Sequence, residues 1–552
     1  MRIVGLAVGL MLSLAPAALA ADDVSSFAVG LICSAEHDPA PAGSERRLVM
    51  VAGVGTGGFA IRTEKPEAQQ WFDYGMQLAH AFYHEDAKAA FRRAREIDPQ
   101  CAMCAWGEAW ADGPTINFDV SDAQFKAAAA LADKAAILAE DESPKNRGLI
   151  AALQARYANH GVPAEVAFAK AMDVLVGQYP DDDEIAILTS DAWLIPWSLH
   201  QDKQGVARSV AVLEPVLARH PDNTGAIHFY IHATEENGEP AKALPYARRL
   251  GALAPGASHL VHMASHTFFR VGLYEEAAAS NAAAIAADGA YLRAVHDASP
   301  QGKDFYHGHN LSFGLGGALS SGDAPLALRL ADHAAFAFPG ELAEAGRSQS
   351  TISHAWIAYA RFAPDRALAL PEPPKTALFS AAMRHYVRGE AFGAKGDVAG
   401  IRAEAAMVTL PAGGDVTLPP FMRGVSQSVV RIAQLTLQGR AAMLEGRPRD
   451  AVAAYQAAAV IEDTKLPPDL DDPPPWWFPE HRALAAALLA AGEPAKAAAE
   501  ARIALKTWPH EPLTLQVLAE AERALGDTAG AQRDLAESQR GWRGGAVSLA
   551  RM

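Results

Sequence analysis

Residues 71–99 read WFDYGMQLAHAFYHEDAKAAFRRAREIDP and have the pattern of two packed helices. Gly75 and Ala87 are small, and we expect them where the two helices cross closely. Pro99 ends the second helix because proline lacks a backbone N–H and clashes with the preceding turn. Large residues fill the space between the helices, and the complete set is Trp71, Tyr74, Gly75, Leu78, Ala87, Phe91 and Pro99. The segment therefore predicts a pair of helices joined by a short turn.

The same layout of a helix, a glycine-containing turn and an alanine-rich helix recurs along the chain. Clear copies follow Gly238, Gly272 and Gly322, and two late copies, at Gly492 and Gly526, lie one 34-residue period apart. These offsets are the pattern of the tetratricopeptide repeat. Alanine suits it, since alanine has the highest helix propensity. The sequence thus predicts an all-α fold, a tetratricopeptide-like helical-hairpin solenoid of about ten helix pairs with a short N-terminal extension.

Breaks in the repeat pattern divide the chain into five predicted parts. Proline-rich connectors at 364–374 and 466–477 interrupt the array, and a β-like run at 47–51 precedes the first repeat. We predict a signal peptide, an N-terminal extension covering the first repeat, and three blocks of repeats, of which the first carries a histidine-rich groove. Their ranges are 1–20, 21–66, 67–362, 375–465 and 478–552.

The first twenty residues have the anatomy of a secretory signal peptide. Arg2 supplies a positive start, residues 3–14 are nearly all apolar, and residues 18–20 form a small-residue cleavage site. No later run reaches the ~20 apolar residues that a membrane-spanning helix needs. We expect cleavage near Ala20 and a periplasmic or secreted protein with no integral membrane segment. A net charge of −16 argues against nucleic acid as the partner.

The chain has three cysteines, Cys33, Cys101 and Cys104. In an oxidising compartment we expect a disulfide between Cys101 and Cys104, or between one of them and Cys33. The residue directly after Cys104 is not a histidine, so covalent haem attachment is not indicated and no haem is expected. The chain also lacks a phosphate-binding loop, so no nucleotide cofactor is expected.

Histidines are concentrated in one part of the chain, where eight of the 19 fall between residues 228 and 309. His228 and His232 are four residues apart, as are His262 and His266, and His259 precedes His262 by three. Each group therefore occupies one face of one helix. Adding the 34-residue period to 228 and 232 gives 262 and 266, so the two groups hold equivalent positions in adjacent repeats.

Several motifs resemble those of one protein family. They are CAMCAWGE at 101–108, GPTIN at 113–117, HFYIH at 228–232 and HLVHMASH at 259–266. From about residue 59 to the C-terminal repeats, the chain resembles a widespread bacterial family of secreted tetratricopeptide-repeat proteins. The resemblance implies the fold, secretion, and a concave groove lined by the first helix of each pair. Relatives carry a second histidine three residues after the one matching His309, and here that position is Ser312, so the family pattern is incomplete there.

Stacking three such helices would bring several imidazoles and one or two carboxylates into one wall of the groove. Neutral imidazole is a good ligand for Zn, Cu, Fe and Ni. We therefore predict a transition-metal site that holds zinc or copper. Its candidate ligands are His228, His232, His259, His262, His266 and His309. His80 and His84 are also four apart, but they lie far away in the sequence, and we expect them to be solvated or to cap helices.

Charged residues follow the histidines on the same helices. Glu235 and Glu236 come one turn after His232, and they would be the catalytic residues if an open coordination position made this an enzyme. Glu235 could instead bind the metal or orient an imidazole. Arg270, one turn after His266, would bind an anionic substrate or partner.

Three functions remain open from the sequence. The first is binding of a divalent transition metal in the groove. The second is a metal-free scaffold whose groove binds a protein or peptide, which is the commonest use of this repeat. The third is a metal-dependent hydrolase or oxidase that uses the same histidines and glutamates.

Overall fold

The computed structural model describes residues 47–552 except 201–202, 300–304, 339–345, 419 and 467–473. The described residues form 24 α-helices and three short 3-10 helices, and no strand occurs among them. The predicted signal peptide, Cys33 and the first part of the extension lie outside the described residues.

The α-helices of the first half are α2 (Pro66–His80), α3 (His84–Ile97), α4 (Ala102–Ala111), α5 (Asp122–Ile137), α6 (Pro144–Tyr157), α7 (Val162–Gln178), α8 (Asp183–His200), α9 (Val206–Arg219), α10 (Thr224–Glu236), α11 (Leu244–Leu253), α12 (Ser258–Arg270) and α13 (Tyr274–Ala294). Those of the second half are α14 (Phe305–Ser321), α15 (Ala324–Ala337), α17 (Gly346–Phe362), α18 (Pro364–Leu368), α19 (Leu378–Ala394), α20 (Val398–Met407), α21 (Pro420–Leu444), α22 (Pro448–Lys465), α23 (Glu480–Ala490), α24 (Pro494–Thr507), α25 (Pro512–Leu525) and α26 (Thr528–Gly541). The 3-10 helices are η1 (Lys203–Gly205), η2 (Pro240–Ala243) and η5 (Leu549–Arg551).

Each helix packs mainly against the helices before and after it in the chain. This is the contact pattern of a repeat array, in which each unit rests on its neighbours. Left-handed glycines such as Gly272 (φ 77°) and Gly322 (φ 75°) make the short turns within pairs. The prediction of an all-α, tetratricopeptide-like solenoid is confirmed. The 24 described helices make twelve pairs rather than about ten, because the repeats from α5 to α9 have blurred sequence patterns.

Phe91 shows why the first repeats need small residues where helices cross. Its ring lies between Gly75 of α2 and Gly107 of α4, where an added Cβ would come within 2.8 Å and 2.4 Å of ring atoms. Ala87 of α3 is fully buried beside them. The close crossing expected at Gly75 and Ala87 is therefore present, and Gly107 extends it to the next pair.

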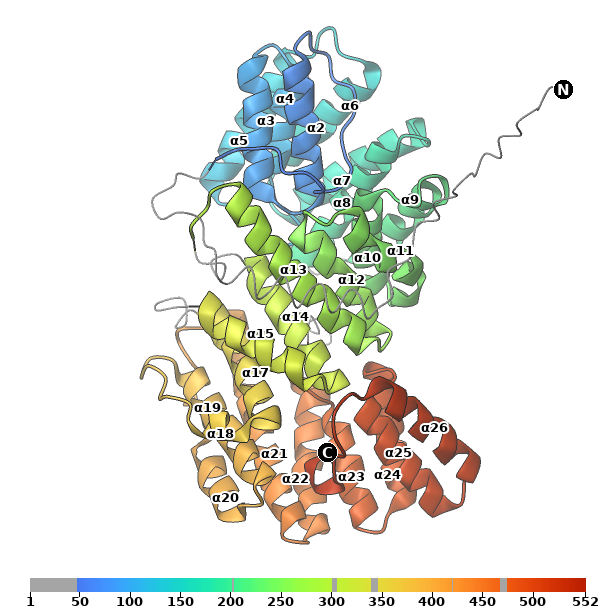
Figure 1. Ribbon diagram of the computed structural model, residues 1–552. Helices are drawn as coiled ribbons and strands as arrows, with labels where there is room; N and C mark the ends of the chain where they lie inside the picture. Colours follow the sequence, from blue (N-terminus) through green and yellow to red (C-terminus); the bar gives the residue numbers. More distant parts are fainter. Residues whose placement is uncertain (1–46, 201–202, 300–304, 339–345, 419, 467–473) are drawn as a thin grey trace, which may run out of the picture.

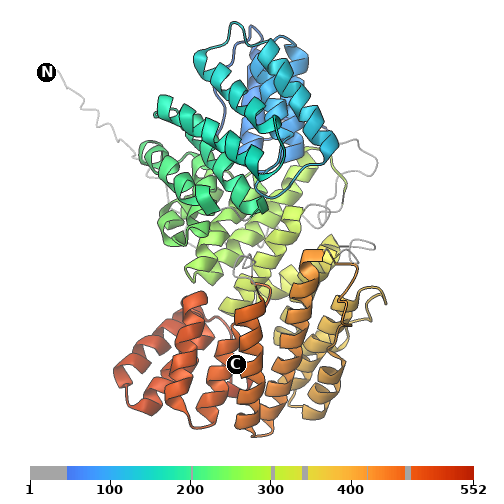
Figure 2. The same ribbon diagram turned by 180° about the vertical axis from the view of Figure 1, so that it is seen from behind.

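The helices form two lobes, which lie one above the other in Figure 1. From behind (Figure 2), the orange and red C-terminal helices stand side by side in the lower lobe. Two hydrophobic clusters largely correspond to the lobes, and both take side chains from α13 and α14, where the lobes join. Trp508, at the end of α24, also belongs to the first cluster. The proline-rich segment 364–374 does not separate the lobes, since Ala367 of α18 is buried inside the second cluster.

The segment 47–63 crosses several repeats instead of covering only the first. Val51 N donates to Tyr74 Oη at 2.9 Å, but Gly53 O accepts from Gly256 N at 2.8 Å, just before α12. Thr56 N donates to Thr224 Oγ1 of α10 at 2.7 Å. The β-like run at 47–51 forms no strand, because its hydrogen-bond partners are helix ends and side chains instead of a neighbouring strand.

Cys101 and Cys104 form a disulfide at the start of α4. Cys101 is also the cap of this helix, since its sulfur accepts a hydrogen bond from Cys104 N at 3.0 Å. Both residues are buried against the first hydrophobic cluster. Among the described helices, none combines the length and the apolar composition needed to cross a membrane.

Candidate metal centre

The clustered histidines lie on α10, α12 and α14, which are the first helices of three consecutive pairs (Figure 1). α10 packs against α12, and α12 packs against α14. The side chain of Asn223 caps α10 by accepting a hydrogen bond from Ala226 N, which sets where the helix begins. Equivalent positions of the adjacent repeats therefore lie next to each other, as the 34-residue spacing indicates.

The imidazoles converge as two groups of three. The first triad is His228, His232 and His259, and the second triad is His262, His266 and His309. Within each triad, one potential ligand atom of every residue lies within 4.8 Å of the others. All six of the predicted ligands thus belong to one triad or the other, and the six rings come from three helices.

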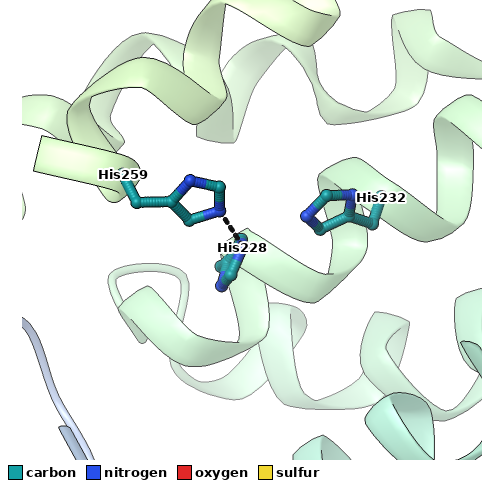
Figure 3. A group of neighbouring side chains, drawn as sticks. All are labelled: His228, His232 and His259. Carbon is teal, nitrogen blue, oxygen red and sulfur yellow. Dashed lines mark hydrogen bonds between the residues drawn. The ribbon is translucent and has the colours of Figure 1, made fainter. Parts of the chain in front are cut away.

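The first triad joins two helices. Nε2 of His228 on α10 lies 3.1 Å from Nε2 of His259 on α12. His232, one turn after His228, points its ring toward the same place (Figure 3). His228 and His259 are buried and His232 is half-buried. The sequence predicted one site for all six histidines, but packing between the helices divides them into two triads and places His259 beside His228.

The second triad joins α12 and α14. Nε2 of His262 lies 2.9 Å from Nε2 of His266, and the ring of His309 has its centroid 4.7 Å from that of His262. Ser312, where relatives have a second histidine, hydrogen bonds to Gly308 O and Thr351 Oγ1. His309 therefore reaches the second triad without help from position 312.

The hydrogen bonds of the second triad determine which ring nitrogens carry protons. His262 Nδ1 faces Asn281 Oδ1 at 2.6 Å, and this atom is the amide oxygen because Asn281 Nδ2 donates to Ala277 O. His266 Nδ1 faces the Glu235 carboxylate at 2.8 Å. Both acceptors require a proton on Nδ1. In the neutral rings, two Nε2 lone pairs then face each other at 2.9 Å, an arrangement that a metal ion or a shared proton between them would stabilise.

In the first triad an acceptor fixes the tautomer of one ring only, because Nε2 of His259 can donate its own proton to Nε2 of His228. His228 Nδ1 donates to the backbone carbonyl of His80 at 2.6 Å, so its Nε2 carries the lone pair that faces His259. Nδ1 of His259 is buried without a hydrogen-bond partner. Burial, followed by the neighbouring histidines, holds the pKa values of His228 and His259 well below the ordinary value. Both rings are therefore neutral at pH 7, which is the form that binds metal.

The Nε2 separations suit a shared ion. Two nitrogens that each lie ~2.0–2.1 Å from one metal, at angles between a right angle and the tetrahedral value, are separated by about 2.9–3.4 Å. The separations of 3.1 Å for His228 and His259 and 2.9 Å for His262 and His266 fall in this range. The other ring nitrogen of three ligands donates to an oxygen, which is the usual arrangement of metal-binding histidines.

Glu235 and Arg270 form a supporting pair beside the second triad. One oxygen of Glu235 accepts from His266, and the other accepts from Arg270 Nε at 2.7 Å. In the structure Glu235 accepts a hydrogen bond from an imidazole, which matches one of the three roles predicted for it. Arg270 contacts this carboxylate, and Glu236 is exposed at the end of α10.

Aromatic residues that the sequence did not single out enclose the imidazoles. The ring of Phe82 lies 4.4 Å from His228 and 4.7 Å from His259, between centroids. Tyr306 lies 4.7 Å from His259, and Phe313 lies 4.7 Å from His266. These contacts join residues that are far apart in the chain, so no local sequence signal could identify them.

Phe82 is also strained. Its φ of 59° is in the left-handed region, which is unfavourable for a bulky residue. Such strain persists only where the surroundings hold it, and it is common at functional sites. The turn between α2 and α3 therefore holds the Phe82 ring against the first triad at a conformational cost.

The prediction of a solvated or helix-capping role is wrong for His80, whereas His84 is half-buried. His80 is buried, its Nε2 bonds to Glu184 at 2.9 Å, and its carbonyl holds His228. Burial, with Lys88 as a second cause, lowers the pKa of His84 to about 3. His80 supports the candidate site because α2 packs on α10, a contact across the repeats that spacing does not reveal. The ring of His84 stacks on that of Phe82.

Comparisons with known proteins show only distant similarity. No protein-family model matches the chain, and no curated protein matches it. Among solved structures, the human IFIT1 dimer with m7Gppp-AAAA is 12% identical over 80% of this chain and 90% of that chain, with a TM-score of 0.32. Naa15/Naa10 bound to HypK-THB is 13% identical over 86% and 89%, with a TM-score of 0.24. The P58(IPK) TPR domain is 14% identical over 61% and 89%, with a TM-score of 0.20. Similarity at this level carries no argument about function.

Proposed function

We propose that the wall formed by α10, α12 and α14 binds two transition-metal ions, one in each triad. The observation that carries this proposal is the pair of Nε2 atoms of His262 and His266, which face each other at 2.9 Å while both Nδ1 atoms bond to acceptors. A metal ion uses both lone pairs at once. His309 supplies the third nitrogen, and the first triad likewise brings three imidazoles together, with the tautomer of His228 fixed by the His80 carbonyl.

The ligand chemistry favours zinc or copper. Three imidazoles per ion leave a coordination position open, and neutral imidazole suits both metals. Burial favours metal binding as well, since ligand rings that are already neutral and oriented need not lose a proton or rotamer freedom. A proton shared between His262 and His266, with the resulting imidazolium paired to Glu235, is the competing explanation of the short contact. It requires no metal, and measurement of metal content separates the two.

The test is elemental analysis of the mature protein, purified without a His tag and reconstituted separately with zinc and with copper. We expect two ions per chain in the wild type. His232→Ala and His309→Ala remove the half-buried member of each triad, so each should lose one ion while the helical circular dichroism signal is kept. The double variant should bind none.

A matched control is available in the same lobe. His307 and His333 are buried and have an Nε2 separation of 3.0 Å, but they form a pair without a third ligand among the described residues. His333→Ala should therefore keep both ions. If the wild type takes up neither metal, the metal proposal is wrong, and binding of a protein or peptide in the groove becomes the working function.

We also propose that the protein acts in the periplasm or outside the cell, as the signal-peptide pattern of residues 1–20 indicates. Mass spectrometry of the exported protein should give a mature chain that starts near residue 21. A chain that keeps its first twenty residues in the cytoplasmic fraction would contradict this localisation.

A further inference from the structure

A second feature of the molecule is a cavity in the second lobe, which is the lower lobe in Figure 1. Arg361 of α17 and Arg551 of η5 form its charged wall, and its other lining residues are Ile357, Ala360, Tyr386, Glu390 and Trp477. Its volume is about 300 Å³, including space that is open to solvent. Ligand pockets span about 300–1,000 Å³, so this cavity suits a small molecule or a single functional group.

The two arginines of the wall lack acidic partners. Neither Arg361 nor Arg551 forms an ion pair or a side-chain hydrogen bond with a residue that the structure describes, and Nε of Arg361 is buried. The Arg361 guanidinium instead lies 5.5 Å from the ring centroid of Trp477 and 5.3 Å from that of Trp542. Aromatic faces hold a guanidinium in place but give its N–H groups no acceptor. An acceptor in the cavity would remove the cost of the unpaired donors.

The nearby acidic residues are already paired with two other arginines. Arg440 and Arg482 are both buried. Arg440 Nη2 lies 3.3 Å from Glu390, and Arg482 Nη1 lies 2.7 Å from Glu511. An oxygen of Met552 accepts from Arg482 Nε at 3.2 Å, and Arg482 Nη2 is buried without a hydrogen-bond partner among the described residues. These acceptors therefore serve Arg440 and Arg482 and leave the two arginines of the wall unpaired.

The electrostatics agree with this geometry. Burial, followed by the three neighbouring guanidiniums, lowers the pKa of Arg361 to about 9, although arginine remains charged at pH 7. Burial raises the pKa of the Glu480 carboxyl, which lies near Arg440 and Arg482, to about 7. Glu480 is therefore only partly ionised at neutral pH and offsets little of the positive charge. An anion in the cavity would offset it directly.

We infer that this cavity binds one oxyanion group, a carboxylate or a phosphate, between Arg361 and Arg551. The planar guanidinium fork matches both groups and binds them through two parallel hydrogen bonds. The small volume favours a small anion over a folded partner. This inference goes beyond the proposed function, because the cavity contains none of the six histidines and lies on other helices.

Isothermal titration calorimetry of the mature chain without added metal tests the inference. Inorganic phosphate is titrated in one arm and succinate in the other, in a buffer free of other multivalent anions. We expect one saturable site per chain for at least one of the two anions. Binding of phosphate alone assigns a phosphate ligand, binding of succinate alone assigns a carboxylate, and binding of both assigns an oxyanion site that accepts either.

Variants locate the site. Arg361→Gln and Arg551→Gln should each weaken binding by about 10–100-fold, because each loses a charged hydrogen-bond donor. The matched control is Arg402→Gln, which changes an exposed arginine of the same lobe whose Nε donates to Glu445 at 2.9 Å. It should leave the affinity unchanged. Equal affinities in all three variants, or no binding of either anion to the folded wild type, would overturn the inference.

A stability measurement separates binding from a structural role. Arg361→Met keeps the apolar stem and removes the unpaired charge, so without anion its midpoint temperature of unfolding should be no lower than that of the wild type. Phosphate or succinate should raise the midpoint of the wild type only. A lower midpoint in Arg361→Met, together with no rise in the wild type, would overturn the inference. The variant carrying both His232→Ala and His309→Ala should bind the anion normally, so failure of the metal proposal leaves this one intact.

Discussion

The backbone carbonyl of His80 accepts a hydrogen bond from Nδ1 of His228 at 2.6 Å, although 148 residues separate them. Because a carbonyl can only accept, Nδ1 must carry the proton and Nε2 is left with its lone pair. The end of α2 therefore determines the tautomer and the orientation of a candidate ligand on α10. The proposed metal site depends on how the first helix pair packs against the fifth.

The first prediction concerns the strain at Phe82. Phe82→Ala should destabilise the protein by about 3–5 kcal/mol, because it removes a buried ring that packs on His228 and His259. Phe82→Gly removes the same ring but relieves the left-handed φ, so it should be more stable than the alanine variant by about 1–2 kcal/mol. Urea denaturation followed by circular dichroism measures both. An alanine variant at least as stable as the glycine variant would show that the turn is not strained.

The second prediction concerns Glu235. Glu235→Gln removes the charge that orients His266, so metal affinity should fall by about 10–100-fold while both ions still bind at saturation. Competition with a zinc chelator gives the affinity. The control is Glu236→Gln, which changes an exposed neighbour and should leave the affinity as it is. Equal affinities in the two variants would rule out the orienting role. If a turnover assay is found, loss of turnover in Glu235→Gln with metal retained would indicate an enzyme.

The third prediction concerns pH. Burial lowers the pKa of His84 to about 3, below its ordinary value near 6.5. Because the unfolded chain then takes up the proton more readily, the contribution of His84 is fully present above about pH 6.5 and is lost as the pH falls toward 3. Between pH 6.5 and pH 5, the free energy of unfolding of the wild type should therefore fall by up to about 2 kcal/mol because of His84. The free energy of unfolding of His84→Gln should fall by correspondingly less, as measured by urea denaturation at both pH values. Identical pH dependence in both proteins would contradict the neutral state of His84 in the folded protein.

The fourth prediction concerns stability with and without metal. Each ion that binds only the folded state should raise the free energy of unfolding by about 2.7 kcal/mol when its free concentration is 100 times its Kd. The midpoint temperature of unfolding should therefore rise when zinc is added and return to its metal-free value when a chelator is added. The variant carrying both His232→Ala and His309→Ala should show no shift. A shift of equal size in that variant would place the zinc outside the two triads.

The sequence by itself determined the repeat and the face on which the histidines lie. Helix spacing places His228 and His232 on one side of a helix, and the 34-residue period repeats this at His262 and His266. These are local properties that propagate from one repeat to the next, because each pair rests on its neighbour. The six candidate ligands could therefore be named before the structure was known.

Only the tertiary structure decided how those ligands divide and what holds them. His259 shares a helix face with His262 but joins His228 on the neighbouring helix, since the packing of α10 on α12 sets where each Nε2 points. The His80 carbonyl and the ring of Phe82 come from a pair more than a hundred residues earlier. Contacts at such separations depend on the curvature of the whole solenoid, which is the sum of many small rotations between repeats and is not encoded in any single one of them.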